Sequence, residues 1–318
     1  MMDIRYKKAL INMKGKKVLV VGGTGFIGFH LIKKCLGLNM IATSISRKKP
    51  TKFQKLNKVT YKICNLNNFQ KLKKVVKNDY DFVVNLGGNI DHSNKEKTYK
   101  SHYIGVKNLY NSLKEKKIKK FIQIGSSSEY GKIFGEVKET EVCRPKMIYG
   151  KSKLNATKFL LHQFKQRNFP VTILRFFQIY GPYQKTNRLI PYVISSSLKN
   201  KNFLCSEGSQ LRDFLFVEDA VSAIIKNFNN EKITLGKIFN VGYGKPIKVK
   251  KIILMIKKII KKGKPVFGKI HLRTDESTKI YPNLKKAKKF LSWKKQTSLQ
   301  KGILKTIIFY KKNMQLKI

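Results

Sequence analysis

Residues Lys17 to Ile32 have the sequence KVLVVGGTGFIGFHLI, and this stretch decides the fold. An apolar, largely β-branched run stops at glycines with the spacing Gly22, Gly25 and Gly28. Apolar residues then recur at helical spacing, so the pattern predicts a strand, a tight turn and a helix. The flanking strand and helix make an ordinary glycine-rich turn the weaker interpretation.

The predicted turn is suited to binding phosphate. Gly22 permits the turn, Gly25 leaves the backbone open to a pyrophosphate, and Gly28 lets the helix lie close to the strand. The N–H groups of the first helical turn, which holds Phe26 and Ile27, favour an anion together with the helix dipole. These residues are candidate contacts of a dinucleotide cofactor.

Length and composition favour a soluble protein of one large or two modest domains. The chain has 318 residues, no apolar run long enough to span a membrane and no signal-peptide pattern, so we expect no membrane insertion and a cytoplasmic location. Residues 1–13 match no element and are expected to be a tail, with Met1 or Met13 as the native start. The cysteines lack metal-ligand spacing, which favours buried thiols in a reducing compartment and no metal site. They are Cys35, Cys64, Cys143 and Cys205.

The formal net charge of +52 raises nucleic acid or an anionic membrane as a partner. The lysines, however, are spread over the whole chain instead of forming one basic, aromatic-rich face, so we expect no nucleic-acid partner. Because the chain strongly prefers lysine, an arginine suggests a need for its bidentate fork. The arginines are Arg5, Arg47, Arg144, Arg167, Arg175, Arg188, Arg212 and Arg273.

The end of the second predicted strand, at 39–47, bears on the choice of cofactor. An acidic residue at such a strand end binds the ribose 2′-hydroxyl of NAD, whereas a small polar residue followed by arginine suits the 2′-phosphate of NADP. Here Ser46 precedes Arg47, which slightly favours NADP among the NAD(P) cofactors. The alternative is that these residues only continue a solvated, cationic surface.

Strands and helices alternate through the first half of the chain. Further strands are expected at 59–64, 81–88, 119–125 and 171–177, and helices at 69–77 and 102–114. This alternation predicts an α/β fold with a Rossmann-like, doubly wound parallel sheet covered on both faces. We place the cofactor domain at 14–181, with a possible return strand at 237–242. A smaller, mainly substrate-binding domain is expected at 182–318, including an amphipathic helix at 249–262.

A candidate catalytic group follows the fifth predicted strand. Tyr149 and Lys153 are four residues apart and share one face of a helix, so the ammonium could pull the pKa of the phenol toward neutrality. A serine at the facing strand end, in the run 125–131, could hydrogen-bond the same substrate oxygen. A lysine-rich chain also produces this spacing by chance, and the alternative is a pair on the helix surface.

With these motifs, the chain resembles the extended short-chain dehydrogenase/reductases of the NAD-dependent epimerase/dehydratase family, which act on nucleotide sugars. The match runs from about Lys16 to the C-terminus. It rests on the segments 22–28, 126–131, 149–153, 174–182, 212–219 and 239–242.

The resemblance implies roles for individual residues. The catalytic serine, tyrosine and lysine fall on Ser126, Tyr149 and Lys153, and Lys153 would also hold the nicotinamide ribose. Arg212 would clamp the nucleotide diphosphate with help from Arg188 or Arg273. Further implied cofactor contacts are Asn65, Leu66, Leu86 and Gly87. Further implied substrate contacts are Ser127, Ser128 and Gln178.

Several positions depart from the family pattern. His102 and Asn65 replace an asparagine and an aspartate, and Gln178 replaces an asparagine on the substrate side. Ser128 occupies the place where sugar 4,6-dehydratases have a glutamate. Glu129 is adjacent, but neighbours on a strand point to opposite faces, so we expect that it does not substitute for that glutamate. His92, after the fourth strand, is interpreted as a loop histidine.

These observations favour C4 reduction or C4 epimerisation of a nucleotide-linked hexose. One alternative is a 4,6-dehydratase. Another is a non-catalytic relative that binds RNA through its basic surface, which would have no use for the serine, tyrosine and lysine. The resemblance also implies a homodimer formed by helices near His102 and Tyr149.

Overall fold

The structure is a computed structural model that describes residues 13–89, 91, 93–229, 231–271 and 277–315. Most of the expected tail lies outside these residues, as do the sequence positions His92 and Arg273. Met13 is buried against the main core.

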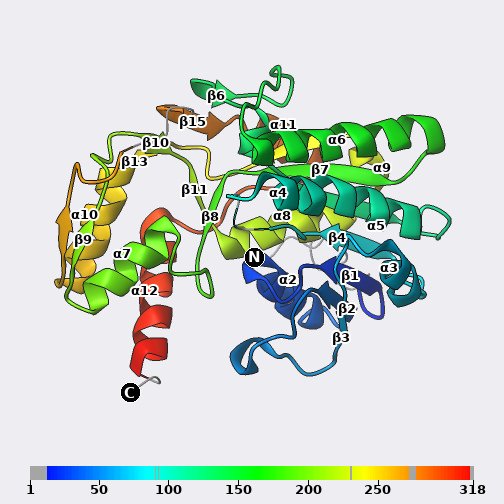
Figure 1. The fold of residues 1–318 in the computed structure, drawn as a ribbon, viewed down its shortest axis with the longest axis horizontal. Coiled ribbons are helices and arrows are strands. Elements are labelled where there is room, and N and C mark those ends of the chain that lie inside the picture. The colour runs from blue at the N-terminus through cyan, green and yellow to red at the C-terminus, as the bar shows by residue number, and fades with distance from the viewer. Residues whose placement is uncertain (1–12, 90, 92, 230, 272–276, 316–318) are drawn as a thin grey trace.

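A seven-stranded parallel sheet forms the centre of the molecule (Figure 1). Its strands, in spatial order, are β12 (Ile238–Val241), β7 (Val171–Phe176), β5 (Lys120–Ser126), β4 (Phe82–Asn85), β1 (Lys17–Val21), β2 (Ile41–Ser46) and β3 (Val59–Ile63). The chain winds outward in one direction from β1 through β2 to β3 and in the other through β4, β5 and β7. This order confirms the doubly wound, Rossmann-like fold.

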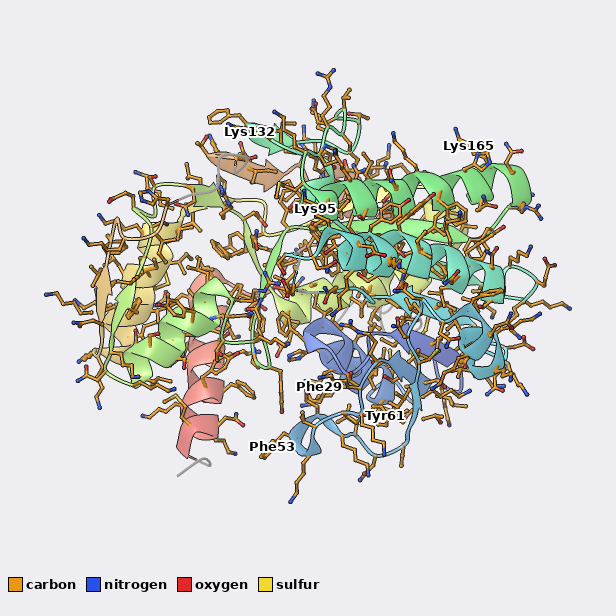
Figure 2. All side chains as sticks on the ribbon, viewed as in Figure 1. Phe29, Phe53, Tyr61, Lys95, Lys132 and Lys165 are labelled. Carbon is orange, nitrogen blue, oxygen red and sulfur yellow. The ribbon has the colours of Figure 1, made fainter. Side chains whose placement is uncertain are left out.

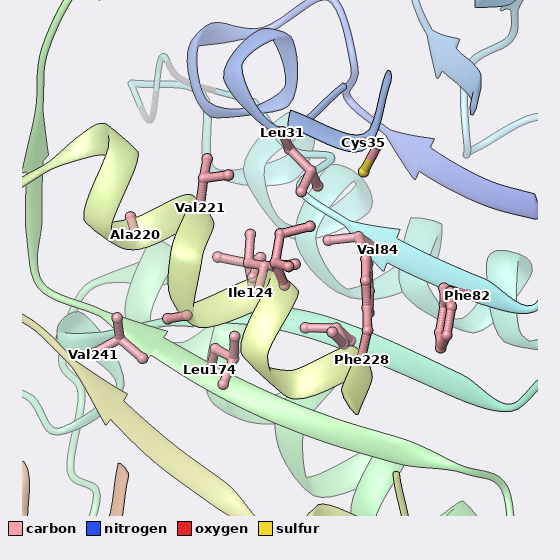
Figure 3. Close-up of a cluster of buried hydrophobic side chains, with 14 of the residues drawn as sticks. Leu31, Cys35, Phe82, Val84, Ile124, Leu174, Ala220, Val221, Phe228 and Val241 are labelled. Carbon is pink, nitrogen blue, oxygen red and sulfur yellow. The ribbon is translucent and has the colours of Figure 1, made fainter. Parts of the chain in front are cut away.

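Helices cover both faces of the sheet. On one face lie α2 (Phe26–Leu36), α8 (Val217–Asn229) and α11 (Lys285–Leu291). On the other lie α3 (Phe69–Val75), α5 (Gly105–Leu113) and α6 (Ile148–Arg167). Figure 3 shows the first core, where Leu31 of α2 and Val221 of α8 lie near Ile124 of β5. Helices therefore shield both faces of the sheet from water, as is usual for a parallel sheet.

Strand β1 shows how the sequence pattern produces this arrangement. Val18 and Val20 pack into the core beneath α2 and α8, and Leu19 and Val21 pack into the core beneath α3, α5 and α6. All four side chains are almost fully buried. Since successive strand residues point to opposite faces, a continuous apolar run is what a strand covered on both sides needs.

The helix expected at 102–114 begins earlier than the periodicity indicated. It starts as α4 (Lys95–Tyr99), passes through a π-helical turn (Lys100–Ile104) and continues as α5. The side chain of Asn94 caps α4 by accepting the N–H of Lys97. The widened turn contains His102, and such π-helical turns occur frequently at functional sites.

A second lobe lies beside the carboxyl edge of the sheet, at the left of Figure 1. Its main helices are α7 (Leu189–Leu198), α10 (Val249–Ile260) and α12 (Leu299–Gln315). Its short strands are β6 (Gly135–Val137), β8 (Gln178–Tyr180), β9 (Asn202–Leu204), β10 (Leu211–Arg212), β11 (Phe214–Phe216), β13 (Ile247–Lys248), β14 (Lys264–Val266) and β15 (Lys279–Pro282). The short helix α9 (Glu231–Thr234) follows α8. One apolar core joins the three main helices to β8 and β11.

The amphipathic pattern of 249–262 corresponds to α10, whose buried face holds Ile252, Ile253 and Ile256. Basic side chains surround the molecule, as Lys95, Lys132 and Lys165 illustrate in Figure 2, and all three are exposed. Within the described residues, no helix is both long and apolar enough to cross a membrane.

The turn after β1 brings helix and strand into direct backbone contact. Gly22 has a φ of 81°, in the region where glycine is favoured. A Cβ at Gly28 would lie 2.2 Å from the carbonyl oxygen of Gly22 and 2.7 Å from the α-carbon of Gly23. Only a hydrogen at Gly28 permits this packing.

We expect Gly28→Ala to lower the free energy of unfolding by about 1–3 kcal/mol, because overpacking outweighs the helix propensity of alanine. Urea unfolding measures the change. Gly37→Ala, at the other end of α2, is the matched control, because Gly37 has a φ of −66° and the nearest atom to its Cβ would be 3.5 Å away. Equal stability changes in the two variants would contradict the packing argument.

Candidate active site

The candidate site lies at the carboxyl ends of the sheet strands. The strand order reverses between β1 and β4, and the helices that follow these two strands, α2 and α5, cover opposite faces of the sheet. Such a switch point leaves a crevice in which doubly wound folds bind their ligands. The loops after β2, β5 and β7 reach the same edge of the sheet.

The turn after β1 fits a dinucleotide pyrophosphate. Gly25 is the N-cap of α2 and has no side chain that could cap the helix. The first turn of α2, with Phe26 and Ile27, contains no acidic residue. The helix therefore presents its first N–H groups and its positive dipole end without a competing anion from its own first turn. Gly22 and Gly28 keep the backbone compact behind this position.

The loops after β1 and β4 touch each other. A Cβ at Gly22 would lie 3.1 Å from the carbonyl carbon of Leu86, and a Cβ at Gly87 would lie 3.0 Å from the Cγ1 atom of Val21. Leu66, after β3, is buried and would lie 3.2 Å from the same Gly87 Cβ. The structure thus brings together Gly22, Leu66, Leu86 and Gly87 from three loops.

Two other predicted cofactor residues lie at the outer part of this edge. Asn65 is exposed, and its side chain accepts the N–H of Asn67 at 3.2 Å. Arg47 is exposed directly after β2. Its neighbour Ser46 is buried and accepts the N–H of Thr24 at 3.2 Å, so this hydroxyl ties the end of β2 to the glycine turn.

Ser126, Tyr149 and Lys153 converge at the end of β5. The Lys153 ammonium donates to the carbonyl oxygen of Ile124 at 2.8 Å. Tyr149 shares a side-chain hydrogen bond with Ser126. Gly150 permits this convergence, because a Cβ there would lie 2.4 Å from the carbonyl oxygen of Ser128. The start of α6 therefore packs directly on the turn that follows β5.

The electrostatics of the trio differ from the sequence expectation. Burial raises the pKa of Tyr149, and the hydrogen bond with Ser126 and the charge of Arg188 oppose that effect. Burial lowers the pKa of Lys153 to about 8, although the charge of Glu129 opposes the shift. The prediction that Lys153 moves the pKa of Tyr149 toward neutrality is wrong for this structure. Desolvation dominates, and the ammonium is directed to a backbone carbonyl.

His102 contacts the site, which the sequence did not predict. Its ring packs edge to face on Tyr149, with centroids 5.0 Å apart. Its Nε2 atom lies 2.9 Å from the carbonyl oxygen of Asn89, so Nε2–H is the donor in this contact. A Cβ at Gly88 would lie 2.1 Å from the imidazole. The sequence did contain one signal for this contact, because His102 replaces the asparagine that is usual at this position in the family.

The argument that placed Glu129 on a strand is also wrong. Residues Ser127–Glu129 form a 3₁₀ turn that Ser126 caps, accepting the N–H of Ser128 at 3.1 Å. Glu129 is fully buried and pairs with Arg175, whereas Ser128 is exposed and Ser127 half-buried. The different exposure of Ser128 and Glu129 therefore results from the geometry of the 3₁₀ turn and not from alternation along a strand.

A cavity of about 310 Å³ lies in the second lobe. Arg212, which is buried and donates to the carbonyl oxygen of Leu211 at 2.9 Å, contributes to its wall together with Gln178. Arg188 is the exposed N-cap of α7, and the helix continues into the wall with Leu189 and Tyr192. Its charge also reaches Tyr149. Arg188 therefore stands at the start of the helix that lines the cavity and acts on Tyr149 through its charge.

Among the residues that the structure describes, no group of three or more His, Cys, Asp or Glu side chains is arranged to hold a metal ion.

Comparisons with known proteins agree with this geometry. The model of the NAD dependent epimerase/dehydratase family matches residues 18–242. A Bacillus subtilis (strain 168) protein described as an uncharacterized UDP-glucose epimerase is 28% identical over 317 residues, covering 92% of this chain and 97% of that protein. Human dTDP-D-glucose 4,6-dehydratase is 29% identical over 328 residues, covering 94% and 91%.

A solved structure with the same fold is UDP-glucuronic acid 4-epimerase from Bacillus cereus in complex with UDP-glucuronic acid and NAD. It is 25% identical, superimposes with a TM-score of 0.86, and the match covers 93% of this chain and 99% of that one.

Proposed function

The chain belongs to the NAD-dependent epimerase/dehydratase family, and from that premise we propose that it is an NAD(P)-dependent enzyme that acts at C4 of a nucleotide-linked sugar, as an epimerase or a reductase. The observation that carries the proposal is the convergence of Ser126, Tyr149 and Lys153 at the end of β5. A module that only binds a partner has no need of this trio beside a dinucleotide turn.

The cofactor would be held by the turn after β1 and the loops that touch it. The N–H groups at the start of α2, behind Gly25, would bind its pyrophosphate, and Gly22, Leu66, Leu86 and Gly87 would line its path. When bound, the nicotinamide supplies or accepts a hydride. Ser46 and Arg47 at the end of β2 favour NADP over NAD within this proposal.

The chain's own residues would manage the proton. The Tyr149 hydroxyl would give a proton to the C4 oxygen or take one from it, while the Ser126 hydroxyl would hydrogen-bond the same oxygen. The Lys153 ammonium, which donates to the carbonyl oxygen of Ile124 at the end of β5, would hold the nicotinamide ribose. The trio thus accounts for proton transfer at one carbon.

Dehydration requires additional groups. A group must remove the C5 proton and an acid must expel the C6 hydroxyl, but the exposed residue at the relevant position is Ser128. The neighbouring carboxylate of Glu129 is fully buried and paired with Arg175. This favours C4 chemistry over 4,6-dehydration for this chain, although one relative is a dehydratase.

The nucleotide diphosphate would lie between the lobes, bound by Arg212 with assistance from Arg188. Arg212 is buried in the cavity wall, where its planar fork can bind two phosphate oxygens. Gln178 lines the same cavity, and Ser127 and Ser128 would contact the sugar near Ser126. Arg273, the other candidate, lies outside the described residues.

Tyr149→Phe should reduce turnover by about 10²-fold or more while cofactor and nucleotide sugar still bind, because only the acidic hydroxyl is removed. A panel of nucleotide hexoses and their 4-keto derivatives is incubated with NADH or NADPH, and products and nicotinamide absorbance are followed. Stoichiometric consumption of the nicotinamide identifies a reductase, and recycling identifies an epimerase. A 4-keto-6-deoxy product from an unmodified nucleotide hexose would refute the assignment.

The parent protein should bind NADPH more tightly than NADH, and Arg47→Ala should weaken NADPH binding alone. A charged hydrogen bond contributes roughly 1.5–3 kcal/mol, so the loss is about tenfold or more. Fluorescence titration of both cofactors measures it. Lys48→Ala, which removes the neighbouring exposed cation, is the control for a general charge effect. Equal affinities of the parent for both cofactors would contradict the NADP proposal.

Arg212→Lys should lower the affinity for a nucleotide diphosphate by about tenfold, because lysine retains the charge but loses the planar fork. Isothermal titration with UDP and dTDP measures the change. Arg167→Lys, an exposed position at the end of α6, is the matched control and should have no effect. If lysine served equally well at position 212, the bidentate contact would be excluded.

A further inference from the structure

A buried ion pair lies directly behind the candidate catalytic serine. The Arg175 Nε atom is 2.9 Å from the Glu129 Oε2 atom, and the two side chains are 2% and 0% exposed. Burying two charges is costly and does not by itself stabilise a fold, so a retained pair requires an explanation.

The hydrogen bonds of Glu129 connect it to the active-site framework. Its Oε1 atom accepts the N–H of Ser126 at 2.8 Å, and its Oε2 atom accepts the Thr157 hydroxyl at 2.9 Å. Thr157 lies one helical turn beyond Lys153 on α6. Gly125 makes room for the carboxylate, because a Cβ there would lie 2.4 Å from Oε1. The carboxylate therefore joins the end of β5 to α6 and β7.

Arg175 is anchored from its other side. Its guanidinium carbon lies 4.5 Å from the centre of the Tyr130 ring, and the Tyr130 hydroxyl donates to the Asn240 side-chain oxygen at 2.7 Å. The Asn240 amide donates to the carbonyl oxygen of Val137 at 2.9 Å. The ion pair is thereby fixed to β12 and β6 as well.

We propose that Glu129 is a positioning residue of the active site, which holds the turn that presents the Ser126 hydroxyl and places one buried negative charge beside Tyr149 and Lys153. The inference rests on the proposed function only in taking these three residues as the proton-transfer groups. Glu129 itself contacts neither sugar nor cofactor in this role, because its carboxylate is enclosed behind the serine turn.

The negative charge of Glu129 shifts the pKa values of Tyr149 and Lys153 in the same direction. It raises the pKa of Tyr149 and opposes the fall in the pKa of Lys153, so it favours the protonated form of each. The other groups facing this region are Arg175 on β7, Arg188 at the start of α7, which opposes the effect on Tyr149, and Tyr130 and Cys143 beside Arg175. Glu129 is the carboxylate that acts on both Tyr149 and Lys153.

Titration of Tyr149, without substrate or cofactor, tests the effect of the Glu129 charge on this residue. Tyrosinate absorbance near 295 nm is followed against pH, and subtracting the same curve for Tyr149→Phe in each background isolates this residue. In Glu129→Gln the Tyr149 titration should move to lower pH, because the variant removes the negative charge that raises the pKa of Tyr149. The double variant Glu129→Gln/Arg175→Met avoids an unpaired buried guanidinium and should move in the same direction if the single variant does not fold.

Glu139→Gln is the matched control, because the Glu139 carboxylate also accepts a backbone N–H at 2.8 Å, that of Asn240, without acting on Tyr149 or Lys153. Its Tyr149 titration should equal that of the parent. A Glu129 variant that folds and titrates like this control would overturn the electrostatic part of the proposal.

The positioning part is tested with Thr157→Val, which removes one of the hydrogen bonds to Glu129 and leaves all charges. With a nucleotide sugar from the panel above, kcat should fall several-fold at unchanged KM. Thr172→Val is the control, since the Thr172 hydroxyl also makes one buried 2.9 Å bond, to the carbonyl oxygen of Thr234. Equal kcat values in the two variants would overturn positioning. If no panel member reacts with the parent, the proposed function fails, and the Tyr149 titration still decides this inference.

Discussion

The close contact between α2 and the turn after β1 is the constraint on which the rest of the structure depends. Because the α-carbon of Gly28 lies against the backbone of Gly22, the helix starts directly at the strand end and directs its N–H groups at one point. The same turn touches the loop after β4 at Leu86 and the end of β2 through Ser46. The proposed dinucleotide position is thus built from contacts between loops that parallel strands bring to one edge.

Charge has two separate uses in this molecule. The exposed lysines form a solvated surface over both lobes, whereas other basic side chains are buried and make directed contacts, namely those of Lys120, Lys153, Arg175 and Arg212. The planar, weakly hydrated guanidinium can be buried beside a carboxylate and a ring, which explains why arginine persists at 175 in a lysine-rich chain. Arg47, Arg144, Arg167 and Arg188 are exposed, so scarcity alone does not identify a buried contact.

Desolvation is the largest influence on the pKa values of the proposed proton-transfer groups Tyr149 and Lys153. Burial opposes charge on both Tyr149 and Lys153, and the surrounding dipoles and charges act against that background. Ser126 connects Tyr149 to the buried Glu129. Its hydroxyl shares a hydrogen bond with Tyr149, and its backbone N–H donates to the Glu129 carboxylate. The His102 ring packs on Tyr149 and contacts the loop after β4 through the carbonyl oxygen of Asn89.

The sequence by itself determined the parallel α/β sheet, the glycine turn between β1 and α2 and the spacing of Tyr149 and Lys153, because apolar periodicity, glycine geometry and helical spacing are local properties. Tertiary structure alone decided the partner of Glu129, the contact of His102 with Tyr149 and the burial that raises the pKa of Tyr149. Each of these depends on residues that are distant in sequence and meet only when β5, β7, α5 and α6 pack together. Local patterns specify which elements form, and desolvation and pairing arise only where those elements meet.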